Sequence, residues 1–231
     1  MIKYASNAFL ATKISFINEI ANVCEEVGAD VATVADGMGL DRRIGQAFLK
    51  AGLGWGGSCF HKDVSALIQM AQEYNYNPAI LPAVIEVNEL QKRRVISKLQ
   101  QHLGSLRDRK IALLGIAFKP NTDDMREASS LVLSARLQAD GARIRAFDPI
   151  AEEEARKLIG GIEFADGALD CVAGADAVVL VTEWPEFRAL DWGAAGARMR
   201  GRLVVDGRNV LDREALAAAG FTYEGIGRGG G

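Results

Sequence analysis

The feature that most constrains the fold is a change in the spacing of hydrophobic residues near Arg109. Before it, apolar residues recur at helical spacing through long stretches, beginning with Ala5 to Val27. After it, short apolar runs bounded by turn residues alternate with helical segments. Strands separated by helices are typical of a parallel sheet covered on both faces. We therefore expect an α/β chain, with an all-helical amino-terminal segment followed by a doubly wound parallel α/β domain.

The expected helices and strands follow from residues that cap helices, from turn residues and from the spacing of apolar residues. Gly28 is placed to end the first helix, and Asp30 and Asp41 are placed to cap the next two. The stretch from Ala79 to Leu103 carries one helical pattern and predicts a long connecting helix. The expected helices cover residues 5–27, 31–38, 41–51, 60–74, 79–103, 129–140 and 151–158, and the expected strands cover 110–115, 143–147, 176–182 and 203–206. The expected domains are residues 1–105 and 106–231, with a frayed glycine-rich tail over 225–231.

Composition excludes several functional classes. Twenty-seven basic and 30 acidic residues give a net charge of −3, which argues against a basic nucleic-acid binder. No apolar run reaches the roughly 18 residues of a membrane helix, and Met1 is not followed by a signal-peptide core. Three cysteines, far apart and odd in number, argue against a disulfide framework, and the two histidines suggest no metal site. We expect a cytoplasmic protein with no membrane, nucleic-acid or metal partner.

The strongest local motif runs from Gly56 to Asp63 and reads Gly-Gly-Ser-Cys-Phe-His-Lys-Asp. Glycines let a backbone approach a ligand closely. Cys59 would lie where a helix begins, and the positive end of the helix together with Lys62 favours the thiolate. A thiolate beside a glycine loop is a candidate covalent nucleophile. The alternative is a small buried residue in a tight turn, as most unpaired cysteines are. Cys24 and Cys171 lie in apolar periodic segments and are expected in the core.

Two other places could carry chemistry. Lys3 and Asn7 are four residues apart, so on a helix they share one face, although spacing alone favours a solvated first turn. The loop from Gly115 to Glu127 and the turn from Asp206 to Arg208 each follow a strand, where doubly wound sheets bind ligands. Each could equally be a polar surface connection. The dinucleotide fingerprint Gly-x-Gly-x-x-Gly is absent from the sequence.

Four segments together resemble one family, the UDP-glucose 6-dehydrogenases. They are Lys3 to Glu19, Gly56 to Asp63, Gly115 to Lys119 and Asp206 to Arg208, and they occur in the family's order over essentially the whole chain. The resemblance covers only the central and carboxyl-terminal portions of such an enzyme. The family's amino-terminal domain, which carries the glycine fingerprint for NAD and further catalytic groups, has no counterpart in these residues.

The resemblance implies a reaction and a set of roles. Family members oxidise the C6 alcohol of UDP-glucose to a carboxylate with two NAD and release no free aldehyde. Cys59 would attack the aldehyde to form a thiohemiacetal, which becomes a thioester that water hydrolyses. Lys3 would stabilise oxyanion charge, Asn7 would orient an oxygen or a water, and Asp63 would assist proton transfer to the hydrolytic water. Further positions match by the same resemblance: substrate contacts at Arg43, Lys50, Gly52, Leu53, Gly54, Trp55, Gly56, Phe60, Phe118, Lys119 and Arg208, and cofactor contacts at Lys62 and Arg126.

The resemblance also implies a Rossmann-like second domain and a homodimer through the helical segment, residues 3 to about 103. Trp55 would offer the sugar nucleotide a flat apolar wall, and Arg43 would reach the neighbouring subunit's site. His61 departs from the family, where proline or glutamine is usual, and is expected to face outward. Two other interpretations remain: a sugar-nucleotide-binding and dimerisation module without turnover, and a sister dehydrogenase for GDP-mannose or a UDP-N-acetylhexosamine. The isolated chain is expected to be inactive.

Overall fold

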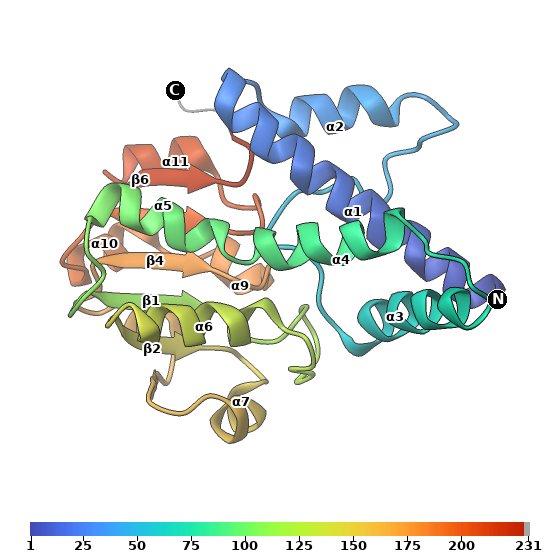
Figure 1. The fold of residues 1–231 in the computed structure, drawn as a ribbon. Coiled ribbons are helices and arrows are strands. Elements are labelled where there is room, and N and C mark those ends of the chain that lie inside the picture. The colour runs from blue at the N-terminus through green and yellow to red at the C-terminus, as the bar shows by residue number, and fades with distance from the viewer. Residues whose placement is uncertain (229–231) are drawn as a thin grey trace. The chain divides into compact units, whose positions relative to one another are not determined.

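The structure is a computed structural model that describes residues 1–228 (Figure 1). The described residues form two compact units, one made of residues 1–92 with residues 226–228, the other of residues 93–225. The first unit is helical and the second is built on a parallel sheet, so the predicted fold class is confirmed. None of the helices in the described residues is long and apolar enough to cross a membrane.

Four helices make up the first unit. They are α1 (Ile2–Val27), α2 (Val31–Gly39), α3 (Ser58–Glu73) and α4 (Ile80–Gln91). Gly28 ends α1 in the left-handed conformation and the Asp30 side chain caps α2, both as predicted. The buried faces of α1, α3 and α4 meet in one apolar cluster: Ala8, Ala11, Trp55, Val64 and Val84.

The predicted helix over residues 41–51 is wrong, because the segment forms successive turns. The Asp41 carboxylate accepts a hydrogen bond from the backbone N–H of Arg43, which favours a turn over a helix. Gly45 and Phe48 both have positive φ, at 66° and 65°. The Lys13 ammonium, from α1, donates to the carbonyl oxygens of Ile44 and Gly45.

The long helix predicted over residues 79–103 is interrupted. It consists of α4 and α5 (Arg94–Leu103), with a turn at Lys92 and Arg93. No proline or glycine marks this turn. The two units divide at the same point, and α5 contacts β5 and α6 of the sheet-bearing unit. The sequence pattern had placed this helix with the first domain.

The second unit contains six parallel strands in the order β3-β2-β1-β4-β5-β6. The strands are β1 (Lys110–Leu114), β2 (Arg143–Phe147), β3 (Glu163–Phe164), β4 (Ala177–Leu180), β5 (Leu203–Asp206) and β6 (Thr222–Gly225). The helices are α5, α6 (Ser129–Ala139), α7 (Glu152–Leu158), α8 (Ala168–Cys171), α9 (Pro185–Arg188), α10 (Trp192–Arg198) and α11 (Arg213–Ala218). This strand order is that of the Rossmann fold. In Figure 1, α5 and α6 lie in front of the sheet.

The central strands read as apolar runs because both faces of the sheet are covered. One face meets α8 to α11, and its core includes Leu114, Val178 and Val204. Each side chain of this size contributes about 1.5–3 kcal/mol when fully buried. Two strands were not predicted from the sequence: β3, which has two residues, and β6. The predicted fraying of the tail is wrong for residues 225–228, whereas residues 229–231 lie outside the described part.

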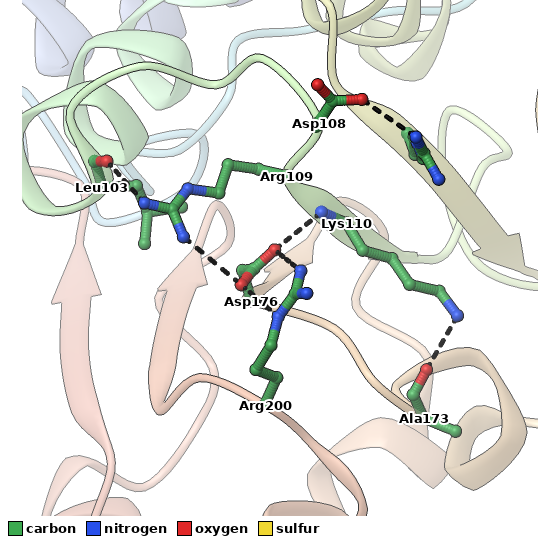
Figure 2. Close-up of polar contacts among 8 residues, drawn as sticks. Leu103, Asp108, Arg109, Lys110, Ala173, Asp176 and Arg200 are labelled. Atoms are coloured by element: carbon green, nitrogen blue, oxygen red, sulfur yellow. Dashed lines mark hydrogen bonds and ion pairs between the residues drawn. The ribbon is translucent and has the colours of Figure 1, made fainter.

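Figure 2 shows an ion-pair cluster at the amino ends of β1 and β4. The Asp176 carboxylate accepts from the backbone N–H of Lys110 at 2.8 Å and from the Arg200 guanidinium through both oxygens. Arg109 lies 3.6 Å from the same carboxylate. Burial raises the pKa of Asp176, but the hydrogen bonds from Arg200 and Lys110 outweigh it, so this pKa lies below its ordinary value. The cluster joins the start of β1 to the segment that precedes β5.

Candidate active site

Cys59 lies in the first turn of α3 and is exposed, whereas Cys24 and Cys171 are buried. Gly57 precedes the helix with φ 82°, a conformation that favours glycine. The positive end of α3 therefore lies beside the sulfur of Cys59. Burial raises the pKa of the Cys171 thiol to about 12, which makes it inert. The prediction that Cys24 and Cys171 lie in the core is confirmed.

Asp63, one helical turn after Cys59, gathers the predicted polar residues of α1. Its carboxylate accepts a 2.6 Å hydrogen bond from the Asn7 amide and lies 3.3 Å from the Lys3 ammonium. Asp63 is 1% exposed while Lys3 is 70% exposed, so a buried carboxylate holds an accessible cation. Residues four apart on a helix share a face, which brings Cys59 and this polar group to the same side of α3. Spacing alone had favoured a solvated first turn for Lys3 and Asn7. That interpretation did not include Asp63, the residue that both of them contact.

The glycine loop, defined here as residues 52–57, contains four glycines in six positions. Leu53 is fully buried and Trp55 is 5% exposed. The indole of Trp55 packs in the apolar cluster of the first unit and donates to the Ser15 hydroxyl at 3.1 Å. The predicted flat wall for a ligand is therefore wrong, because this ring belongs to the core.

The other predicted residues of the first unit are more accessible. Arg43 is 89% exposed and pairs with Asp41, and its hydrogen bonds hold the pKa of that carboxyl below its ordinary value. Lys50 and Lys62 are exposed. The Phe60 ring is half-buried and packs edge-on against Trp55, with ring centroids 5.9 Å apart. Exposed cations on loops and helix ends suit anionic ligands.

The loops after β1, β4 and β5 lie at the carboxyl edge of the sheet. The strand order reverses between β1 and β4. In such sheets this reversal is the usual ligand site. The loop after β1 carries Phe118 and Lys119, with the Lys119 ammonium 5.2 Å from the ring centre of Phe118. Gly115 has φ 85°, and a Cβ there would lie 2.5 Å from the Cβ of Thr182, after β4. The two loops therefore meet at a position that only glycine fits.

Arg208, in the turn after β5, is fixed from two sides. Its guanidinium donates to the Val181 carbonyl at 2.7 Å and lies 3.2 Å from the Glu183 carboxylate. Burial lowers the pKa of Arg208 while Glu183 and Asp206 raise it, and the net direction is downward. Asp206 accepts from the backbone N–H groups of Val210 and Leu211, but its burial raises its pKa above the ordinary value. A rigid, half-buried guanidinium at the carboxyl edge suits a phosphate or a carbonyl.

Asp148 directly follows β2 and is not among the residues singled out from the sequence. It is 2% exposed and accepts from the backbone N–H groups of Ile116 and Ala117 at 2.7 and 3.1 Å. In a dinucleotide-binding sheet, the amides after the first strand cradle the pyrophosphate. Here a carboxylate already uses them, and α6 begins only at Ser129. The sheet of this chain therefore does not fit NAD in that mode. A strand ending in Asp-Pro was the available signal for Asp148.

The second predicted cofactor residue, Arg126, lies in the loop between β1 and α6. It is 69% exposed and forms a bidentate pair with Asp124, which lowers the pKa of that carboxyl. His61, in the first turn of α3, is half-buried. Among the described residues no group of three or more His, Cys, Asp or Glu side chains is placed to hold a metal ion.

Two family models match most of the chain. Residues 1–90 match the central domain, and residues 112–213 the UDP-binding domain, of UDP-glucose/GDP-mannose dehydrogenases. The chain belongs to this family. The predicted resemblance is confirmed.

Relatives within the family are similar over the whole chain. UDP-glucose 6-dehydrogenase TuaD of Bacillus subtilis is 48% identical over 99% of this chain and 50% of its own length. A UDP-glucose dehydrogenase structure from Pyrobaculum islandicum is 40% identical, with a TM-score of 0.88 over 98% of this chain and 50% of that one. A UDP-D-ManNAc dehydrogenase structure from Pyrococcus horikoshii is 27% identical, with a TM-score of 0.83 over 99% and 51%. The chain thus spans about half the length of these relatives.

Proposed function

We propose that the chain is the central and carboxyl-terminal portion of a UDP-glucose 6-dehydrogenase, which oxidises UDP-glucose to UDP-glucuronate. The observation that carries the proposal is the accessible Cys59 in the first turn of α3, one turn from the buried Asp63 that Lys3 and Asn7 contact. Membership of the family and the relatives named UDP-glucose 6-dehydrogenase support the substrate. The unpaired cysteines of the chain suit a reducing, cytoplasmic setting.

Each residue of the first unit has a role in the proposed chemistry. The Cys59 sulfur adds to the C6 aldehyde and forms a thiohemiacetal, and oxidation of that adduct gives a thioester on the same sulfur. The Lys3 ammonium stabilises the negative charge that develops on the oxygen. Asp63 accepts a proton from the water that hydrolyses the thioester, and Asn7 orients that water. The product carboxylate leaves and the Cys59 thiol is restored.

NAD, when bound, accepts a hydride in each of the two oxidations. Its principal binding groups would lie in a part of the protein outside these residues, because the sheet described here does not fit it. Lys62 and Arg126 are proposed to contact it, since both are exposed cations. The isolated chain should therefore form no NADH from UDP-glucose and NAD, as measured by absorbance at saturating concentrations of both. NADH formation by the pure chain would contradict this part of the proposal.

The second unit is proposed to hold the UDP moiety. The match of residues 112–213 to a UDP-binding domain supports this role. Phe118, Lys119 and Arg208 all belong to loops at the carboxyl edge of the sheet, where an aromatic face and two cations suit a base and a diphosphate. By the family resemblance, residues 50–56 and Phe60 are proposed as further contacts to the sugar nucleotide.

A homodimer is also proposed. Ile2, Phe9, Phe16 and Val23 recur every seventh residue along α1, and all four are exposed by 45% or more. Such a stripe is typical of a helix face that another copy covers. Arg43, exposed on the same unit, is then available to reach the partner's site.

The decisive experiment replaces the nucleophile. We would fuse the chain behind the amino-terminal half of TuaD, the 48% identical relative, and compare Cys59→Ala with the unchanged fusion. UDP-glucuronate formation, followed by chromatography, should fall by at least about a thousandfold while calorimetry shows unchanged UDP-glucose binding. Ser58→Ala, the preceding residue of the same helical turn, serves as the matched control. Undiminished uronate production by Cys59→Ala would overturn the assignment.

A further inference from the structure

We propose that Asn88 is a positioning residue, which holds the glycine loop and through it sets the place of Cys59. Asn88 lies on α4, is 1% exposed, and belongs to none of the four segments that carry the family resemblance. The expected effect of Asn88 on turnover rests on the proposed function, whereas its expected effect on the loop does not.

The Asn88 side chain pairs with the backbone of one loop residue. Its oxygen accepts from the Trp55 N–H at 2.7 Å, and its amide nitrogen donates to the Trp55 carbonyl at 3.0 Å. The side-chain amide thus supplies the two hydrogen bonds that a buried extended backbone would otherwise receive from a neighbouring strand. Both backbone groups are buried, so losing the amide would leave a donor and an acceptor without partners.

Gly54 shows how closely Asn88 approaches the loop. A Cβ on Gly54 would lie 2.5 Å from the Asn88 side-chain oxygen, and Gly54 also has φ 90°. Only bare backbone allows this approach. The amide of Asn88 and the glycine at position 54 therefore fit one another.

Two more buried amides fix the start of the loop. The Gly52 N–H donates to the Asn18 side-chain oxygen at 2.8 Å, and its carbonyl accepts from the Gln91 amide at 3.0 Å. Asn18 is fully buried and Gln91 is 1% exposed. Asn88 and Gln91 are three apart and so share one face of α4. This face presents two carboxamides to the loop: Asn88 both donates and accepts there, whereas Gln91 donates to Gly52 and accepts from Asn22.

The chain from Trp55 to the nucleophile is short. Only Gly56 and Gly57 separate Trp55 from Ser58, where α3 begins. Glycines carry no side chain that could anchor this link by packing. Trp55 is therefore the last residue of the loop before Cys59 for which we describe an anchor, with its backbone held by Asn88 and its indole by the core and Ser15. Losing the two hydrogen bonds from Asn88 should loosen both the loop and the first turn of α3.

The first test measures the loop in the chain as it stands, without substrate. Hydrogen exchange followed by mass spectrometry would compare Asn88→Ala with Val84→Ala, which removes buried apolar volume one turn earlier on α4 but no hydrogen bond to the loop. Each variant would be measured the same number of degrees below its own midpoint of thermal unfolding. The exchange rate of the amides of residues 54–59 should rise at least about tenfold in Asn88→Ala, and clearly less in Val84→Ala. Equal increases in the two variants would reduce Asn88 to a merely stabilising residue and overturn the proposal.

The second test measures turnover in the fusion with the amino-terminal half of TuaD. Asn88→Ala should lower kcat by roughly tenfold while the KM for UDP-glucose changes by less than about twofold. Asn88→Asp keeps the acceptor for the Trp55 N–H and should retain part of the lost rate. An unchanged kcat in a variant whose loop has loosened would contradict the positioning role. If the unchanged fusion shows no turnover, the proposed function fails, and the exchange comparison still decides whether Asn88 holds the loop.

Discussion

The two units hold their key loops with different chemistry. In the first unit, buried carboxamides of Asn18, Asn88 and Gln91 bond the glycine loop through both N–H and carbonyl groups. In the second, the carboxylates of Asp148 and Asp206 bond only N–H and O–H donors. An amide donates and accepts, so it fits extended buried backbone, while a carboxylate accepts only and fits turns rich in N–H groups. The first arrangement contains no titratable side chain, whereas in the second burial raises the pKa of Asp206 above its ordinary value.

The largest effect on stability is expected from Asp148→Ala. Four backbone N–H groups and the Trp184 indole donate to this carboxylate, and the change removes the partner of all five, most of which are buried. We expect a loss of about 4 kcal/mol in the free energy of unfolding, measured by urea denaturation. Asp123→Ala, an exposed residue in the loop after β1, should change stability by less than about 0.5 kcal/mol. A loss below about 1 kcal/mol would mean that the carboxylate is not what holds the loop.

Gly115→Ala should come next. Positive φ costs about 1–2 kcal/mol for a residue with a Cβ, and that Cβ would also meet the backbone of Thr182. Gly28→Ala is the matched control, because Gly28 has φ 73° but nothing lies within 4 Å of its Cβ position. We expect Gly115→Ala to cost at least 1 kcal/mol more than Gly28→Ala in the same denaturation assay. Equal losses would show that the loops after β1 and β4 do not pack as described.

The smallest effect concerns pH. The pKa of Asp176 lies below its ordinary 3.8 in the folded chain, so its ion pair adds stability above about pH 4 that is lost as pH falls through the folded value. Arg200→Ala should cost about 0.5–1 kcal/mol at pH 7, since the arginine is 60% exposed. The difference from the unchanged chain should shrink towards pH 3. A difference that stays constant with pH would assign the loss to packing.

Sequence patterns predicted elements whose periodicity and caps agree with their burial. Asp30 and Gly28 mark helix ends in the sequence, and the apolar runs of β1, β4 and β5 are buried on both faces. The segment over residues 41–51 was mispredicted, because the Asp41 carboxylate accepts from the backbone N–H of Arg43 and the Lys13 ammonium donates to the Ile44 carbonyl, which favours turns there. The interruption of the long helix at Lys92 carries no proline or glycine signal.

Some residues of the candidate site could likewise be predicted from the sequence, and others could not. Cys59 and Asp63 stand out in one short motif, and their spacing alone places them on one face of a helix. Trp55 shows the limit, since a tryptophan beside glycines fits a ligand wall as well as a core, and only burial separates the two. The role of Asn88 in holding Trp55, and that of Asp148 in holding Ile116 and Ala117, were missed because these backbone partners are distant in the sequence. No spacing rule marks such contacts.

The most direct measurement of the central claim is the chemical state of Cys59 during turnover. The fusion with the amino-terminal half of TuaD would be mixed with UDP-glucose and NAD, quenched in acid within the first turnovers, digested and analysed by mass spectrometry. The account predicts a peptide containing Cys59 that carries the oxidised sugar nucleotide as a thioester, and no such adduct on Cys24 or Cys171. Steady formation of UDP-glucuronate with Cys59 unmodified at every quench time would contradict it.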